Sequence, residues 1–270
     1  MSLKKFASWK IQSDDRFKLS DIPTRLPASK SQVDQGKWLK ALFERLNTLQ
    51  NTLYASKSNG LLLVLQGMDT AGKDGVIRHV FTHVSPLGVR AQAFAAPTDE
   101  EKRHDFLWRI HSKLPGKGEM VIFNRSHYED VLVPQVRGLL KPAMIEKRLA
   151  HIRNFETLLQ DEGITVLKCF LHISKSEQKK RLQARMEDPL KQWKLQASDF
   201  EDRKLWPAFM RAYQQTLSAT STKEAPWYII PADDKSDRNQ FLAELLVNTL
   251  ENMHLKMPVP TLKLSNFKLS

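Results

Sequence analysis

Residues 67–75 combine glycines, a lysine and carboxylates in the pattern of a phosphate-binding loop. Gly67, Gly72 and Lys73 have the G-x-x-x-x-G-K spacing, directly after the apolar run 61–65. Glycines let backbone N–H groups turn inward around an anion, and the following helix presents its positive end to the same anion. The lysine of this pattern reaches the phosphoryl group in transfer. The predicted phosphate ligands are Gly67, Met68, Thr70, Ala71, Gly72, Lys73, Asp74, Gly75 and Arg78.

Two carboxylates make this loop unusual. Asp74 stands where a Ser or Thr hydroxyl normally holds Mg²⁺, and Asp69 lies inside the loop. Carboxylates repel phosphate unless metal ions lie between them, and hard cations prefer oxygen ligands. We therefore expect a site that uses Mg²⁺, with Mn²⁺ as a substitute, and name Asp69 and Asp74 as candidate ligands. The alternative is a glycine-rich turn between a strand and a helix, with a surface lysine.

A second cluster follows the strand candidate 119–123. Asn124 and Arg125 come first, and Glu129 and Asp130 lie one helical turn later. A guanidinium forks onto phosphate oxygens, so we expect Arg125 to bind the transferring phosphate and Asn124 to contact the nucleotide. Glu129 and Asp130 are further candidate metal ligands. Alternatively, these acids only favour the dipole of a helix N-terminus.

A third group is basic and lies between residues 181 and 206. Arg181 and Arg185 share one helix face, and Pro189 ends that helix. We expect two helices joined by a turn that contains Trp193, closing as a lid that excludes water from the phosphates. A solvated helical hairpin is the alternative. The other predicted phosphate ligands of this lid are Lys191, Lys194, Arg203 and Lys204.

The segment after the second strand candidate is a candidate nucleotide site. Pro97 and Thr98 form a turn, and Arg109 lies on a short helical stretch beyond it. We expect Arg109 to meet the phosphate of the acceptor nucleotide. Trp108 beside it is more typical of a core residue than of a base-stacking one.

Strands and helices alternate along the chain, which predicts an α/β fold with a parallel sheet covered on both faces. Ligands of such sheets bind beyond the carboxyl ends of the strands, where residues 67–75 would lie. Pairs with capping-box spacing mark three helix starts, at Thr98, Ser174 and Ser198. The predicted elements are a helix at about 37–54 and strands at 61–66, 89–95, 119–123, 164–172 and 226–231.

Composition narrows the class of protein. The chain has 270 residues and a formal net charge of +12, which points to polyanionic partners such as nucleic acid, a membrane surface or a phosphate-rich substrate. Cys169, the only cysteine, lies in an apolar run and is expected to be a buried thiol. The sequence shows neither a signal-peptide pattern nor an apolar run of membrane-spanning length, so we expect a cytoplasmic protein.

Four motifs together resemble the second family of polyphosphate kinases, over about residues 36–255. They are G-x-D-x-x-G-K-D-G, N-R-S-x-Y-E-D, R-x-x-x-R followed by D-P-x-K-x-W-K, and A-P-W-Y-x-I-P. The strings F-N-R-S-H-Y-E-D-V-L-V at 123–133 and F-L-H-I-S-K at 170–175 resemble the class III branch, whose members act on nucleoside mono- and diphosphates.

This resemblance implies a three-layer P-loop kinase fold like that of thymidylate kinase, with a mobile helical lid. It implies reversible, Mg²⁺-dependent phosphoryl transfer between inorganic polyphosphate and adenine or guanine nucleotides. Asp69 would hold metal or orient the acceptor, Lys73 would bind the polyphosphate end, and Arg125 would neutralise the transferring phosphoryl group. Arg181 and Arg185 would close from the lid. Some branches carry Asp in place of Asn124, so here the metal carboxylate must come from elsewhere.

We expect an N-terminal arm at 1–35, laid over the core, one kinase domain at 36–257 with its lid at about 181–206, and a tail at 258–270. We also expect a homodimer or homotetramer, with neither nucleic acid nor membrane as partner. Two alternatives stay open. An ATP-dependent nucleoside or nucleotide kinase would share the core. A basic nucleic-acid-binding protein would share the charge, but the chain lacks a known reader motif.

Overall fold

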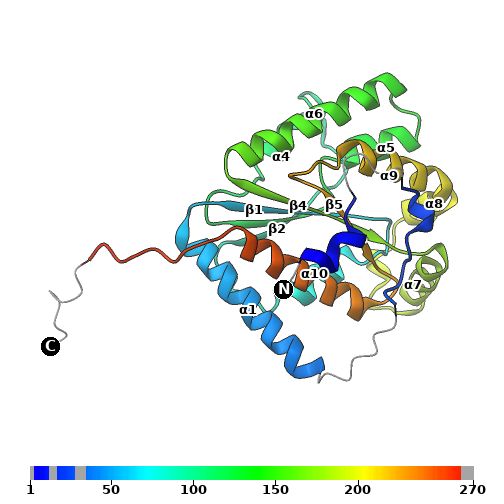
Figure 1. Cartoon of the computed structure of the whole chain (residues 1–270). Coiled ribbons are helices and arrows are strands. Elements are labelled where there is room, and N and C mark those ends of the chain that lie inside the picture. Colours follow the sequence, from blue (N-terminus) through cyan, green and yellow to red (C-terminus); the bar gives the residue numbers. More distant parts are fainter. Residues whose placement is uncertain (1–2, 12–16, 28–34, 263–270) are drawn as a thin grey trace.

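A parallel five-stranded sheet forms the centre of the computed structural model, which describes residues 3–11, 17–27 and 35–262 (Figure 1). The strands pair in the order β2-β3-β1-β4-β5, and every pair is parallel. Each strand lies within two residues of its predicted position. The strands are β1 (Gly60–Gln66), β2 (Val89–Ala93), β3 (Met120–Asn124), β4 (Ile164–His172) and β5 (Trp227–Pro231).

Helices cover both faces of the sheet (Figure 1). One layer contains α1 (Gln35–Ser56), α2 (Lys73–Phe81) and α10 (Lys235–Asn252). The opposite layer contains α5 (Glu129–Val136), α6 (Pro142–Asp161) and α9 (Trp206–Thr220). The remaining helices are α3 (Asp99–Lys102), α4 (Trp108–His111), α7 (Lys175–Glu187), α8 (Ala197–Lys204) and the 3₁₀ turns η1 (Leu3–Trp9), η2 (Leu19–Asp21) and η3 (Gln192–Lys194). The predicted α/β class with three layers is confirmed.

Strands β1 and β4 are largely apolar on both faces, because helices cover both faces of the sheet. Leu61 to Leu65 of β1 are all fully buried, and the apolar residues of β4 are buried from Val166 onward. Cys169 lies there as a buried free thiol, and burial raises its pKa. An inert core cysteine was the expectation, and it is confirmed.

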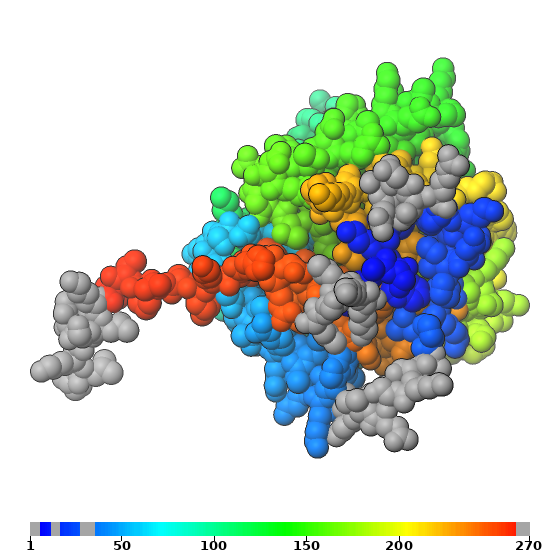
Figure 2. Space-filling model, viewed as in Figure 1, coloured from blue at the N-terminus to red at the C-terminus, as the bar shows by residue number. Residues whose placement is uncertain are grey.

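The described part of the N-terminal segment lies along β5 and α10. Phe6 and Ile11 are buried, and the Phe6 ring meets Phe241 of α10 at 5.2 Å between centroids. The Ile11 N–H donates to the Trp227 carbonyl oxygen at 2.9 Å. At the other end the chain leaves α10 and runs away from the body with exposed residues such as Val259 (Figure 2). The arm and tail boundaries proposed from sequence remain predictions.

One helix start was predicted wrongly. Ser198 and Glu201 have capping-box spacing, but α8 begins at Ala197, so Ser198 lies inside the first turn. The extended residue Gln196 is the cap, and it exchanges hydrogen bonds with Asp199 instead. Several acidic and polar residues of this segment have the spacing of a capping box. The hydrogen bonds between Gln196 and the buried Asp199 determine which box forms. The other two starts, at Thr98 and Ser174, are confirmed by cap hydrogen bonds.

The strand order creates a crevice between β1 and β3. After β1 the chain crosses to the β2 side through α2, whereas after β3 it crosses to the β4 side through α5 and α6. The chain therefore leaves the carboxyl ends of these two neighbouring strands in opposite directions. Ligands of such sheets bind in the crevice that forms between the two connections. Among the described residues, no helix is long and apolar enough to cross a bilayer.

Candidate active site between β1 and β3

The loop between β1 and α2 is built on left-handed backbone positions. Gly67, Thr70 and Gly72 have φ values of +151°, +65° and +103°. A Cβ at Gly67 would lie 2.8 Å from the Leu171 carbonyl oxygen, so only glycine fits between the loop and β4. The loop therefore curls tightly over the end of the sheet, and α2 begins directly after it at Lys73.

Lys73 is buried inside this loop. Its Nζ donates to the carbonyl oxygens of Gly67 at 2.6 Å and Met68 at 3.3 Å. Burial, and then the positive charge of Arg125, lower its pKa, while Asp69 and Glu129 oppose the shift. An anion beside this ammonium group would favour its charged form.

Arg125 faces the loop from the end of β3. Its φ of +61° is unusual for a residue with a side chain, and such strain is concentrated at functional sites. The guanidinium lies 2.7 Å from Asp69 Oδ1 and 4.0 Å from Glu129 Oε2. Burial opposes its charge, but Glu129 and Asp69 outweigh burial and raise its pKa. The side chain stays 38% exposed, so its charge can also meet a ligand.

The predicted metal ligands do not converge on one point. Asp74 is 58% exposed, accepts a hydrogen bond from Asn124 Nδ2 at 2.7 Å, and lies 3.9 Å from Lys194 Nζ. Glu129 lies deeper, where burial raises its pKa even though Arg125 and Lys73 act in the opposite direction. Asp130 turns away and pairs with a different arginine. Across the described ranges, no three His, Cys, Asp or Glu side chains form a ready metal cluster.

This donor set nevertheless fits Mg²⁺. Mg²⁺ is usually held by one or two carboxylates together with substrate phosphates and water, rather than by an all-protein cage. Asp69 and Asp74 lie in and directly after the loop, and Asp74 is open to solvent. The Thr70 hydroxyl is buried in the same loop without a hydrogen-bond partner in the described part of the chain.

Arg181 lies behind the loop rather than over it. Its guanidinium donates to the carbonyl oxygens of Thr70 at 3.0 Å, Ala71 at 3.1 Å and Ala232 at 2.6 Å, and it is buried. We expected Arg181 to close from a lid, and this placement corrects that expectation. Because α7 starts at the end of β4, beside β1, its second turn packs against the back of the loop.

The other predicted lid residues are spread over the segment 181–206. The Lys194 ammonium group lies 3.9 Å from Asp74 Oδ2, next to the loop. Arg203 Nη1 donates hydrogen bonds to the Lys175 carbonyl oxygen and to Gln178 Oε1. Arg185 is partly buried and faces Asp199 electrostatically. Lys191 and Lys204 are exposed, as is Arg78 on α2.

Several residues at the site carried no recognisable sequence signal. Gln178 Nε2 donates to the Asp69 carbonyl oxygen at 3.1 Å. Asp199 and Asp202 of α8 lie close enough to Asp69 that its charge contributes to raising their pKa, after burial. Arg238 of α10 contacts Ala71, 167 positions away in the sequence. No spacing rule links such distant positions, so only the fold reveals them.

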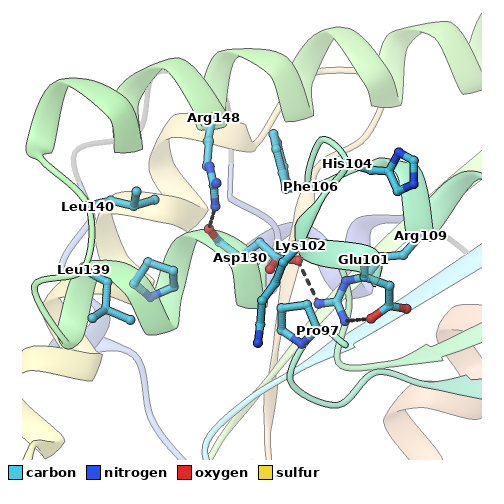
Figure 3. Close-up of a pocket in the computed structure, with 11 residues that line it drawn as sticks. Pro97, Glu101, Lys102, His104, Phe106, Arg109, Asp130, Leu139, Leu140 and Arg148 are labelled. Atoms are coloured by element: carbon cyan, nitrogen blue, oxygen red, sulfur yellow. Dashed lines mark hydrogen bonds and ion pairs between the residues drawn. The ribbon is translucent and has the colours of Figure 1, made fainter. Parts of the chain in front are cut away.

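The predicted nucleotide residues Pro97 and Arg109 line one cavity of about 240 Å³ (Figure 3). Arg109 is buried and donates to Asp130 Oδ2 at 2.8 Å and to the Ala95 carbonyl oxygen at 2.9 Å. Thr98 caps α3 instead of lining the cavity. The remaining lining residues are Glu101, Lys102, His104, Phe106, Asp130, Pro134, Leu139, Leu140 and Arg148.

Part of the cavity lining is apolar, with Phe106 on one side and Leu139 and Leu140 on another (Figure 3). Phe106 lies under the Arg148 guanidinium at 4.8 Å from the ring centroid, and Arg148 donates to the Asp130 carbonyl oxygen at 2.6 Å. A flat, weakly polar group fits such a lining better than a bare phosphate does.

The fold and this loop define a P-loop kinase. The profile described as Polyphosphate kinase 2 (PPK2) matches residues 29–258, and the chain belongs to that family. It is 48% identical over 257 residues to the AMP/ADP-polyphosphate phosphotransferase of Meiothermus ruber, covering 93% of this chain and 95% of that protein. It is 38% identical over 270 residues to the ADP-polyphosphate phosphotransferase of Rhodopseudomonas palustris, with coverage of 95% and 93%.

A solved structure agrees with these relatives. The crystal structure of polyphosphate kinase 2 from Arthrobacter aurescens TC1 matches with a TM-score of 0.91 and 39% identity, over 96% of this chain and 93% of that one. The resemblance to this family and the kinase fold are confirmed, and so is the expected transfer of phosphate: the chain is an enzyme that transfers phosphate between polyphosphate and nucleotides. Its metal and the reversibility of the reaction stay predictions. The roles of individual site residues stay predictions.

Proposed function

We propose that this enzyme transfers phosphoryl groups from inorganic polyphosphate to nucleoside mono- and diphosphates, converting AMP to ADP and ADP to ATP. The observation that carries the proposal is the meeting of Lys73, in a phosphate loop, and Arg125 in one crevice between β1 and β3. The relative from Meiothermus ruber, named for both AMP and ADP, supports the range of acceptors. We further propose that the reaction is reversible.

In this mechanism the donor end of polyphosphate occupies the loop. Backbone N–H groups and Lys73 hold its phosphates, and Lys73 exchanges its bonds to Gly67 and Met68 for bonds to phosphate oxygens. Arg125 neutralises charge on the transferring group. Phosphoryl transfer requires positioning and charge neutralisation more than covalent help from the protein, which this set of residues supplies.

Asp69 and Asp74 would hold Mg²⁺, or Mn²⁺ in its place. When bound, the metal supplies positive charge between these carboxylates and the phosphates. The exposure of Asp74 supports this assignment, and Asp69 would exchange its 2.7 Å ion pair with Arg125 for the metal. Glu129 then acts through Arg125, whose guanidinium lies 4.0 Å from its carboxylate.

We place the base of an adenine or guanine nucleotide against the apolar part of the cavity lining in Figure 3. Asn124 and Arg125, at the end of β3, would contact its phosphates. Arg109 would meet those phosphates only by leaving Asp130, so its proposed phosphate role is weaker than its role in shaping the cavity.

The segment 181–206 is proposed to close over the phosphates, with Arg185 and Lys194 on its inner side. A cytoplasmic homodimer or homotetramer remains part of the proposal, and so does the absence of nucleic acid and membrane partners. The basic composition is explained by the substrate itself, because polyphosphate carries about one negative charge per phosphate and needs a cationic groove.

The decisive assay follows AMP, ADP and ATP over time with excess polyphosphate and Mg²⁺, and with no ATP supplied. We expect ADP and ATP to form. Transfer from ATP but not from polyphosphate would instead assign the chain to ordinary nucleotide kinases. Lys73→Ala and Asp69→Asn should each reduce turnover at least about 100-fold with an unchanged fold. Lys117→Ala, at an exposed lysine before β3, is the matched control.

A further inference from the structure

A second arginine, Arg238 of α10, lies directly behind the phosphate loop. Its side chain is only 2% exposed. Nη1 donates to the Ala71 carbonyl oxygen at 3.1 Å, and Nη2 donates to Asn239 Oδ1 at 2.8 Å. A Cβ at Gly72 would lie 1.9 Å from Nη1, so the loop packs against this guanidinium too closely to admit a side chain at Gly72.

The Ala71 carbonyl oxygen receives hydrogen bonds from two buried guanidinium groups. Arg181 donates to it at 3.1 Å, beside Arg238. Arg181 is also paired with Glu177 at 2.9 Å. In contrast, the hydrogen bonds that Arg238 makes within the described residues all go to neutral oxygens of Ala71 and Asn239. Burial and the neighbouring Arg181 lower the pKa of Arg238 to about 10, against the influence of Asp234.

A buried charge without a paired carboxylate destabilises the fold. Packing does not require a charge at this position, because an apolar side chain would fill the same volume. Two consequences of this charge reach the loop. First, the hydrogen bond fixes the Ala71 carbonyl oxygen toward Arg238, and we expect this to turn the following N–H groups toward the phosphate side. Second, no carboxylate of the described residues lies within ion-pair distance of this guanidinium, so its positive potential extends into the anion site despite the influence of Asp234.

We infer that Arg238 is a positioning residue of the phosphate loop, which fixes the loop at Ala71 and adds positive charge behind it without touching substrate. This inference rests on the proposed role of the loop in holding polyphosphate. It extends the site to a helix on the far side of the loop that neither the motifs nor the relatives' names single out.

The test compares Arg238→Met, which removes charge and hydrogen bonds, with Arg238→Lys, which keeps the charge. KM and kcat are measured separately for polyphosphate and ADP, together with the melting temperature. We expect Arg238→Met to raise KM for the substrate in the loop by about tenfold or more, and to leave the other KM within about twofold. Arg238→Lys should give an intermediate KM. Asn248→Ala, at a buried polar residue of the same helix, should lower the melting temperature without changing either KM.

The inference is overturned if Arg238→Met leaves both KM values within about twofold while lowering the melting temperature as Asn248→Ala does. If Arg238→Met does not fold, an unchanged KM in Arg238→Lys overturns it equally, since lysine lacks the planar guanidinium whose Nη1 reaches Ala71 while Nε and Nη2 bind Asn239. A rise in KM for ADP instead of polyphosphate would uphold the role of Arg238. It would show at the same time that the proposed occupant of the loop is wrong.

Discussion

Substituting Gly72 by alanine tests how tightly the loop and Arg238 fit together. Gly72 has a φ of +103°, and a Cβ there would lie 1.9 Å from Arg238 Nη1 and 2.8 Å from its Cζ. Those atoms belong to the guanidinium that anchors Ala71. Because Arg238 is buried on α10, it cannot move aside without losing that anchor. The methyl group therefore affects both partners of one contact.

Two costs contribute to the expected effect. The left-handed backbone costs about 1–2 kcal/mol for a residue with a Cβ. Losing a hydrogen bond from a charged donor costs about 1.5–3 kcal/mol. We therefore expect Gly72→Ala to lower the free energy of unfolding by about 2.5–5 kcal/mol, unless the loop shifts to relieve the strain. A shifted loop would misplace Lys73 and lower kcat/KM for polyphosphate by at least about 100-fold, since misplacement of about 1 Å has that effect.

Gly138 offers a matched control. Its φ is +65°, and a Cβ there would meet no atom within 4 Å. Gly138→Ala should therefore show the backbone cost alone, about 1–2 kcal/mol, with kcat/KM unchanged. Urea unfolding gives the free energy of unfolding of both variants, and the time course of AMP, ADP and ATP with polyphosphate gives kcat/KM. If Gly72→Ala behaves like Gly138→Ala in both measurements, the contact with Arg238 does not organise the loop, and the reasoning is refuted.

Three further outcomes are expected away from the loop. Lys168→Met should destabilise the protein by about 3–5 kcal/mol in urea, because it leaves Glu156 buried without its 2.6 Å partner, and adding Glu156→Gln should recover part of the loss. Burial opposes the charge of Glu156, but Lys168 and His127 outweigh it and lower its pKa. Its stabilisation is therefore present above about pH 4.5 and lost as the pH falls toward the folded-state pKa, so Glu156→Gln should flatten acid unfolding in that window. Arg137→Met should remove the ion pairs from α5 to Glu201 and Asp202 and speed amide exchange across α8 by roughly twofold to fivefold; unchanged exchange would show that these pairs do not hold α8.

The sequence alone determined the features that local pattern encodes. Apolar runs located the buried strands β1, β3, β4 and β5, because most residues of a strand covered on both faces must be apolar, and the predicted edge strand β2 is only partly buried. The glycines and Lys73 located the phosphate loop, since only glycine accepts the backbone at Gly67 and Gly72. The spacing of Arg125 after β3 predicted a second cationic group at the same sheet edge. Local pattern was weaker where several caps compete, as at Ser198.

The tertiary structure decided which of the predicted side chains act together. Asp130 pairs with Arg109 instead of joining Asp74, and Arg181 holds the back of the loop instead of covering it. Arg238 enters the site although nothing near it in the sequence suggests phosphate chemistry. These outcomes depend on the order β2-β3-β1-β4-β5, which brings helices from the end of the chain against a loop near its start. Residue type and spacing report a side chain's chemistry, but its partner is set by distances through space that only the packed fold establishes.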